Sequence, residues 1–161
     1  MAETLTIATG SKEAKYRELT PQVKSMLECE DDLIANMANV ASMIHETFGF
    51  LWTGFYRVKK TDNEANETLI LGPFQGPLAC TRIRKGKGVC GTAWERGETV
   101  IVEDVDKFPG HIACSSASRS EIVVPLKMEG RVVAVLDIDS GETGTFDKTD
   151  QQFLEEIMAM F

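Results

Sequence analysis

The spacing of apolar residues in the first third of the chain predicts helices. Between residues 31 and 49, apolar positions recur at helical spacing and a glycine follows the last of them, which is typical of a helix that ends in a left-handed cap. These apolar positions are Leu33, Ile34, Met37, Val40, Ala41, Ile44 and Phe48. An earlier helix is predicted to begin at Thr20-Pro21, with threonine as the N-cap and proline in the first turn. A closing amphipathic helix is predicted to be capped near Asp147. Its apolar side, which faces the core, consists of Phe153, Leu154, Ile157 and Met158.

From residue 50 onward the apolar period changes to two, which is typical of strands. One face of the strand predicted over residues 50–58 carries Phe50, Trp52, Gly54, Tyr56 and Val58. Further strands are predicted over residues 68–74, 79–83, 99–102, 121–127 and 131–139. They are joined by a hairpin loop at 59–67, a basic turn at 84–88, a short helix at 89–96 and a long loop at 103–120. The whole chain, residues 1–161, is therefore predicted to be a single α+β domain with a central antiparallel sheet of about six strands flanked by helices.

Composition and charge narrow the class of protein. The 161 residues are 43% apolar and 26% charged, as in ordinary folded proteins, and 25 acidic against 17 basic residues give a net charge of −8. This charge repels phosphate backbones and anionic lipids, so neither nucleic acid nor a membrane is an expected partner. The longest aliphatic run, residues 132–136, is far shorter than a membrane span of ~20 residues, and the first ten residues lack the features of a signal peptide. We therefore expect a cytoplasmic protein, in a compartment where standing disulfides are rare.

Asp137 and Asp139 stand out because they end the most hydrophobic strand, and aspartate is depleted in strands. Being two residues apart they share a face, and Glu121 opens the partner strand. Carboxylates that converge at a strand end repel one another, which raises the pKa of at least one and suits binding a cation, supplying a proton, or both. The simpler interpretation is that the aspartates are solvated and start a turn. A divalent metal site is disfavoured, because no nearby cluster supplies the oxygens that calcium takes.

The aromatic residues Trp52 and Tyr56 lie on one face of their predicted strand. Packing in the core is the default for aromatic side chains in a strand. The alternative is that they form the walls of a pocket, where they would hold an apolar thioether chain.

The four cysteines include no Cys-x-x-Cys pair, so neither a zinc knuckle nor a thioredoxin-type redox motif is present. A metal site would also have to use His45 and His111, which are scattered, and we expect none. Cys29 is predicted to be structural, because it lies in a helical region far from the glycine-rich centre. Cys114 lies in a serine-rich loop where backbone N–H groups can stabilise a thiolate, whereas Cys90 begins a short helix and is compatible with either role.

The chain closely resembles the free methionine-(R)-sulfoxide reductases, which are GAF-domain proteins. The resemblance lies in the spacing of three cysteines and in the acidic strand end that follows them. The matching positions are Cys80, Cys90 and Cys114, with nine and twenty-three residues between them, then Glu121, Asp137 and Asp139. The resemblance also covers Gly72-Pro73-Phe74-Gln75-Gly76, Gly88-Val89-Cys90-Gly91 and Phe108-Pro109-Gly110-His111. It implies a GAF fold over nearly the whole chain. A GAF module that only binds a ligand has no need of this combination.

The resemblance also implies a role for each matching residue. Cys114 corresponds to the nucleophile that attacks the sulfoxide and becomes a sulfenic acid, Cys80 to the resolving cysteine that condenses with it into a disulfide, and Cys90 to a third cysteine that assists or protects. The acidic pocket corresponds to Glu121, Asp137 and Asp139, and the aromatic wall to Trp52 and Tyr56. A carboxylic acid held neutral activates the sulfoxide, and the other carboxylates bind the ammonium of the free amino acid. The external reductant in the family is thioredoxin, which NADPH and thioredoxin reductase keep reduced. The resemblance implies no bound cofactor or metal.

Two other classes of function remain as alternatives. A non-catalytic GAF sensor module would bind a small molecule, such as a cyclic nucleotide or tetrapyrrole, without changing it. A structural or dimerisation role is the third alternative, and a homodimer would use the helices before Gly49. An oxidant-dependent Cys80–Cys114 disulfide that thioredoxin reverses is expected for the reductase and for neither rival.

Overall fold

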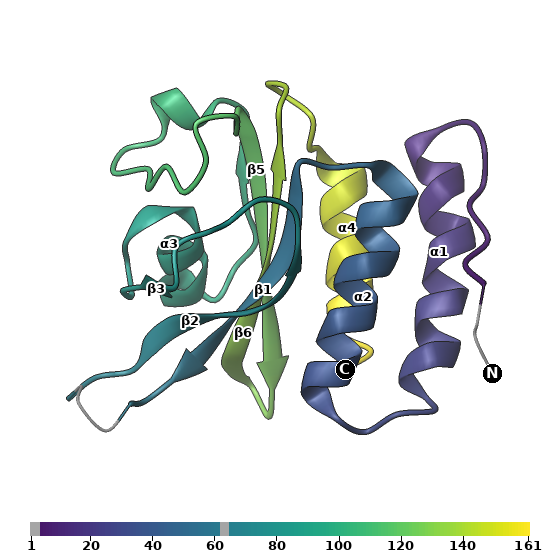
Figure 1. Cartoon of the computed structure of the whole chain (residues 1–161), viewed down its shortest axis with the longest axis horizontal. Coiled ribbons are helices and arrows are strands. Elements are labelled where there is room, and N and C mark those ends of the chain that lie inside the picture. Colours follow the sequence, from purple (N-terminus) through teal and green to yellow (C-terminus); the bar gives the residue numbers. More distant parts are fainter. Residues whose placement is uncertain (1–3, 62–64) are drawn as a thin grey trace.

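A six-stranded antiparallel sheet forms the centre of the computed structural model, which describes residues 4–61 and 65–161 (Figure 1). The strands are β1 (Trp52–Lys59), β2 (Thr68–Gln75), β3 (Arg82–Ile83), β4 (Val100–Val102), β5 (Ser120–Met128) and β6 (Arg131–Ser140). They lie in the order β3-β2-β1-β6-β5-β4. This arrangement confirms the predicted α+β class and central sheet. Residues 62–64 of the predicted hairpin loop lie outside the described residues.

Helices cover both faces of the sheet and divide the core in two (Figure 1). On one face lie α2 (Leu33–Phe48) and α4 (Lys148–Met158), and α1 (Lys12–Leu27) packs on the outer side of these two helices. On the other face lies α3 (Gly88–Arg96). The sheet therefore presents alternate side chains to two separate apolar clusters: Phe55 and Leu136 face the helices α2 and α4, whereas Tyr56 and Val135 face α3. Within the described ranges, every helix is too short or too polar to cross a bilayer.

The predicted second and last helices are confirmed, with the left-handed end at Gly49 and the cap at Asp147. Asp32 accepts a hydrogen bond from the Ala35 N–H at the start of α2, and Gly49 ends the helix with a left-handed φ of 66°. Asp147 caps α4 in a capping box with Asp150.

The predicted start of the first helix at Thr20-Pro21 is wrong. The helix α1 begins nine residues before Pro21, after Ser11, whose side chain accepts a hydrogen bond from the Ala14 N–H. Proline inside a helix removes a hydrogen bond and costs ~3 kcal/mol. Burial of one apolar side of α1 offsets that cost on both sides of the proline, with Tyr16, Leu19 and Val23 at most 1% exposed.

Two predicted strand boundaries also differ from the structure. Phe50 precedes β1 and packs on the helix side of the sheet, beside Phe48 and Phe146, so it does not share a face with Trp52. Only Arg82–Ile83 of the strand predicted over 79–83 pairs with the sheet. The Thr81 carbonyl still accepts a hydrogen bond from the Leu71 N–H of β2, whereas Ala79 and Cys80 approach the functional site.

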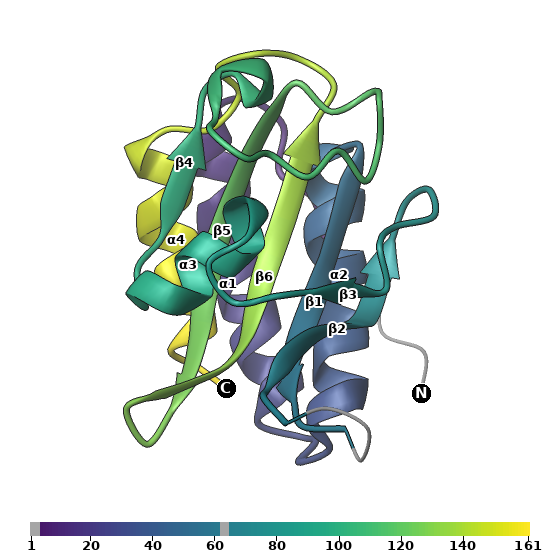
Figure 2. The ribbon, with the colours of Figure 1, turned by 90° about the vertical axis from the view of Figure 1, so that its left-hand side faces the viewer.

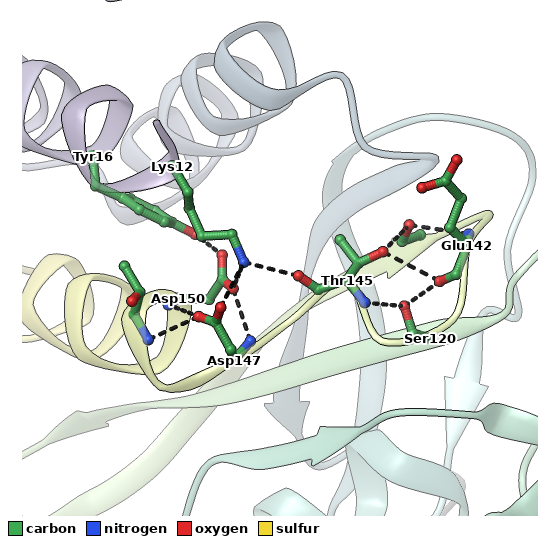
Figure 3. A network of polar contacts seen from close by, with 9 residues as sticks. Lys12, Tyr16, Ser120, Glu142, Thr145, Asp147 and Asp150 are labelled. Atoms are coloured by element: carbon green, nitrogen blue, oxygen red, sulfur yellow. Dashed lines mark hydrogen bonds and ion pairs between the residues drawn. The ribbon is translucent and has the colours of Figure 1, made fainter. Parts of the chain in front are cut away.

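A buried polar network ties α1 to α4 and to the start of β5 (Figure 3). The Lys12 Nζ donates to Asp150 Oδ2 at 2.5 Å, and the Tyr16 hydroxyl donates to Asp150 Oδ1 at 2.7 Å. Lys12 also donates to the carbonyl of Thr145, and the backbone N–H of Thr145 donates to Ser120 Oγ. The fully buried Asp150 carboxylate of α4 thus accepts hydrogen bonds from two residues of α1.

Replacing Asp150 by alanine is expected to lower the free energy of unfolding by about 2–3 kcal/mol, because Tyr16 and Lys12 lose a buried charged acceptor. The loss stays below the ~5 kcal/mol of a fully buried pair because the Lys12 side chain is 29% exposed. Urea denaturation followed by tryptophan fluorescence measures it. Glu13→Ala, which breaks the exposed pair with Arg17 on the same helix, is the control and should cost at most about 0.5 kcal/mol. Equal losses in the two variants would contradict this account.

Candidate functional site

The candidate site is a small cavity at the end of the sheet where β6 ends and β1 and β5 begin. The helix α3 and the loop of residues 103–119 lie over this part of the sheet (Figure 2). The cavity has a volume of about 30 Å³. Of the predicted site residues, those that line it are Trp52, Tyr56, Cys90, Cys114, Glu121, Asp137 and Asp139. Cys80 is joined to this set through Cys114.

Strand register brings the three carboxyl groups together. Glu121 on β5 lies directly opposite Asp139 on β6, and Asp137 lies two residues further along the same face. On the other side of β6, Trp52 is the partner of Asp139, so the aromatic strand borders the acids. Glu121 and Asp137 are only 5% and 6% exposed. The solvated strand-end interpretation of the aspartates is therefore wrong for Asp137, because pairing on both sides buries it.

Burial raises the pKa of all three carboxyl groups, and repulsion between carboxylates adds to this effect for Glu121 and Asp137. Desolvation, followed by the charge of Asp139, raises the pKa of Glu121 to about 8. Desolvation and the charge of Glu121 raise the pKa of Asp137 well above its ordinary value. Burial raises the pKa of Asp139 less, because the Ser118 hydroxyl donates a 2.5 Å hydrogen bond to its carboxylate. At neutral pH the cluster therefore holds at least one proton inside the cavity.

The raised pKa of Glu121 predicts that stability depends on pH. At pH values between the ordinary pKa of Glu121, 4.5, and its raised pKa of about 8, Glu121 has lost its proton in the unfolded chain but keeps it in the folded protein. The free energy of unfolding is therefore expected to fall as the pH rises through this interval, and Glu121→Gln is expected to reduce the slope. Urea denaturation at a series of pH values tests this, with the exposed substitution Glu98→Gln as control. A slope that is unchanged in Glu121→Gln would contradict the assignment.

The aromatic wall is fixed by stacking and by hydrogen bonds. The Trp52 ring stacks on Tyr56 and on Phe74, with centroids 5.9 and 5.2 Å apart. Its Nε1 donates to the Pro77 carbonyl at 3.0 Å, and the Tyr56 hydroxyl donates to the Cys80 carbonyl at 2.9 Å. These bonds anchor the segment before β3 to the strand β1. A wall made in this way is rigid and apolar on the side that faces the cavity.

A disulfide joins Cys80 and Cys114 at the cavity, with 5.5 Å between their Cα atoms. Cys90 is buried at the start of α3 beside Asp137, and burial together with the Asp137 charge raises the pKa of its thiol. Cys90 is therefore held as a neutral thiol and not as a thiolate. Cys29 lies away from the cavity lining, but it is exposed beyond the end of α1 and so lacks the burial expected of a structural cysteine.

Two further residues of the loop contact the acids and were not predicted from the sequence. The His111 Nε2 lies 3.5 Å from Glu121 Oε2, and its side chain is 13% exposed. Ser118 is the donor to Asp139 noted above. Both belong to the loop that carries Cys114. The signals that pointed to them were the length of that loop and, for His111, its place in the matching segment Phe108-Pro109-Gly110-His111.

Cys90 Sγ and one oxygen each of Glu121 and Asp137 lie within 4.8 Å of one another, close enough to surround a small ion. Among the described residues this is the one such group of three, and three donors are fewer than the four of a structural zinc site. The raised pKa of each group means that protons compete with any metal. The arrangement is better suited to hydrogen-bond and protonate a ligand than to hold a metal.

Comparison with known proteins supports one family over the whole length of the chain. The family model of the GAF domain matches residues 30–160. GAF domain-containing protein A of Dictyostelium discoideum is 54% identical over 160 residues, which cover 99% of this chain and 98% of that protein. The free methionine-R-sulfoxide reductase of Escherichia coli is 41% identical over 145 residues, which cover 89% and 84%. The structure of free methionine-R-sulfoxide reductase from Neisseria meningitidis in complex with its substrate superposes with a TM-score of 0.92 at 51% identity, covering 98% of this chain and 92% of that one.

Proposed function

Because this chain belongs to the free methionine-(R)-sulfoxide reductases, oxidoreductases of the GAF-domain family, we propose that it reduces free L-methionine-(R)-sulfoxide with Cys114 as nucleophile and Cys80 as resolving cysteine. The observation that carries this proposal is the Cys80–Cys114 disulfide beside three carboxyl groups of raised pKa. A redox-active sulfur and a buried proton donor are the two requirements of sulfoxide reduction. The acid makes the sulfoxide electrophilic and the thiolate supplies the electrons.

The substrate is held at both of its ends. The apolar wall of Trp52 and Tyr56 packs against the thioether chain, and the cluster of acids binds the ammonium group. A protonated carboxyl, Glu121 or Asp137, donates a hydrogen bond to the sulfoxide oxygen. Methionine within a peptide has no free ammonium, and burying the carboxylates without that cation would be costly, so the free amino acid is preferred.

The reaction has two covalent steps. The Cys114 thiolate attacks the sulfoxide sulfur. The sulfoxide oxygen passes to the Cys114 sulfur with a proton from the acid, so that methionine is released and Cys114 becomes a sulfenic acid. The Cys80 thiol then attacks this sulfenic sulfur, forming the disulfide and releasing water. Cys90 assists without entering the covalent cycle, because its thiol hydrogen-bonds Asp137 and helps to orient that carboxyl.

The disulfide must be reduced before the next cycle. We assign this step to thioredoxin, kept reduced by NADPH and thioredoxin reductase. Such recycling places the protein in a reducing compartment, the cytoplasm. No bound organic cofactor or metal takes part in the proposed cycle.

The experiment that tests this function follows NADPH consumption in a thioredoxin and thioredoxin reductase assay. Three substrates are compared: free L-methionine-(R)-sulfoxide, its S epimer, and the N-acetylated R form. We expect turnover of the free R epimer, with at least roughly a hundredfold lower kcat/KM for the N-acetylated form, because a site built for a charged group rejects an analogue that lacks it. If reduced, folded protein turned over none of the three, the proposal would be abandoned for that of a sensor module.

A further inference from the structure

Exposed apolar side chains flank the disulfide on both of its arms. Leu78, two residues before Cys80, is 89% exposed, and Ile112, two residues before Cys114, is 37% exposed. Single exposed hydrophobic residues are common on protein surfaces. These two border the same cavity, and the cysteines beside them are only partly buried. Apolar surface is thus placed where another protein must approach to reach the disulfide.

The surface next to this apolar pair is basic, although the chain has a net charge of −8. Arg84, Lys85 and Lys87 are all exposed, and no acidic residue occurs between positions 79 and 91. Two acids approach this turn from elsewhere: Glu95 lies at Gly86, and Glu67 lines the same hollow as Arg84 and Lys85. The basic turn adjoins one member of the apolar pair, because Gly88, the residue after Lys87, lies against the Ile112 side chain.

We propose that this surface, Leu78, Ile112, Arg84, Lys85 and Lys87, is the docking site of the dithiol protein that reduces the Cys80–Cys114 disulfide. It fits a partner whose reactive cysteine is surrounded by apolar surface with acidic residues at the edge, so that apolar contacts form near the sulfur and opposite charges meet at the rim. The inference rests on the proposed function, since it names the surface through which that cycle is closed.

The position of the surface assigns Cys80 as the sulfur that the partner attacks. Leu78 and the basic turn lie on either side of Cys80 in the chain, and the bond from the Tyr56 hydroxyl holds the Cys80 backbone in place. The partner thiolate attacks Cys80 Sγ, the bond to Cys114 breaks, and Cys114 leaves as a thiolate. The second thiol of the partner then attacks the mixed disulfide and releases Cys80, so the partner dithiol is oxidised by two electrons. Attack at Cys80 returns Cys114 directly in the form that the next sulfoxide requires.

The test compares thioredoxin with dithiothreitol, a small dithiol that needs no docking surface. The double variant Arg84→Glu/Lys87→Glu is expected to raise the KM for thioredoxin roughly tenfold or more, while turnover driven by dithiothreitol stays at the wild-type rate. In the wild type, kcat/KM for thioredoxin should fall with added salt. The matched control Lys24→Glu/Lys59→Glu reverses two exposed charges on other elements and should leave the KM for thioredoxin unchanged.

A trapping experiment tests the assignment of the sulfur. Thioredoxin that lacks its second active-site cysteine should form a mixed disulfide with Cys80, identified by mass spectrometry of the joined peptides. An unchanged KM for thioredoxin in the charge variant, or trapping on Cys114, would overturn the inference. If the wild type did not reduce the sulfoxide even with dithiothreitol, the proposed function itself would be refuted, so the two failures are distinguishable.

Discussion

Cys114→Ser is expected to lose all reduction of free methionine-(R)-sulfoxide, with kcat lowered by at least roughly 10⁴ with either thioredoxin or dithiothreitol. A serine hydroxyl does not ionise near neutral pH and is a poor nucleophile toward sulfur. Because the first covalent step is absent, the variant should release no methionine even in a single turnover. Rapid-quench measurement of methionine per enzyme tests this. Cys29→Ser, at an exposed position outside the site, is the control and should keep the wild-type rate.

Cys80→Ser separates the first covalent step from the second. This variant keeps the nucleophile, so it should release one methionine per enzyme and then stop when thioredoxin is the reductant. Mass spectrometry should find the sulfenic acid on Cys114. The proposed roles would have to be exchanged if Cys80→Ser gave no methionine while Cys114→Ser released one equivalent.

Glu121→Gln is expected to show the second largest effect, a fall in single-turnover rate of roughly 10²–10⁴, the range of general acid catalysis. Glutamine keeps the shape of the side chain but supplies no proton. In the wild type, the rate should fall as the pH rises through about 8, because the acid form of Glu121 is present below its pKa and is lost above it. This alkaline limb should be absent in Glu121→Gln.

Asp139→Asn provides the matched control for this experiment. Asp139 lies opposite Glu121 in the same cluster, but its carboxylate accepts a hydrogen bond from Ser118 and is better suited to bind the ammonium group. We expect its substitution to raise the KM for sulfoxide more than it lowers kcat, and to keep an alkaline limb. An alkaline limb that persisted in Glu121→Gln and vanished in Asp139→Asn would move the acid role to Asp139.

The sequence predicted those parts of the fold that local signals determine. Gly49 ends α2 and Asp147 caps α4 as expected, because capping depends on residues next to each other in the chain. The start of α1 was predicted wrongly from the signal at Pro21, since it depends on the burial of Tyr16 against other helices. The local signal that was overlooked is Ser11, whose side chain caps the first turn of the helix.

The site shows the same division between local and long-range information. Asp137 and Asp139 were found because carboxylates break the pattern of a hydrophobic strand. His111 and Ser118 were missed because their contacts arise only when the loop of residues 103–119 folds over the sheet. The pairing of Cys80 with Cys114 came from family resemblance, since three later cysteines allow other pairs at the level of sequence alone.

The size of the closed cavity has a consequence for the order of the reaction. With the disulfide formed, the cavity of about 30 Å³ has room for roughly two water molecules, so methionine and the disulfide do not share it. In the proposed cycle we therefore expect methionine to leave before the disulfide closes, so that the reductant reacts with an enzyme free of methionine. Initial rates measured against both substrates should give parallel double-reciprocal lines, the pattern of a ping-pong mechanism.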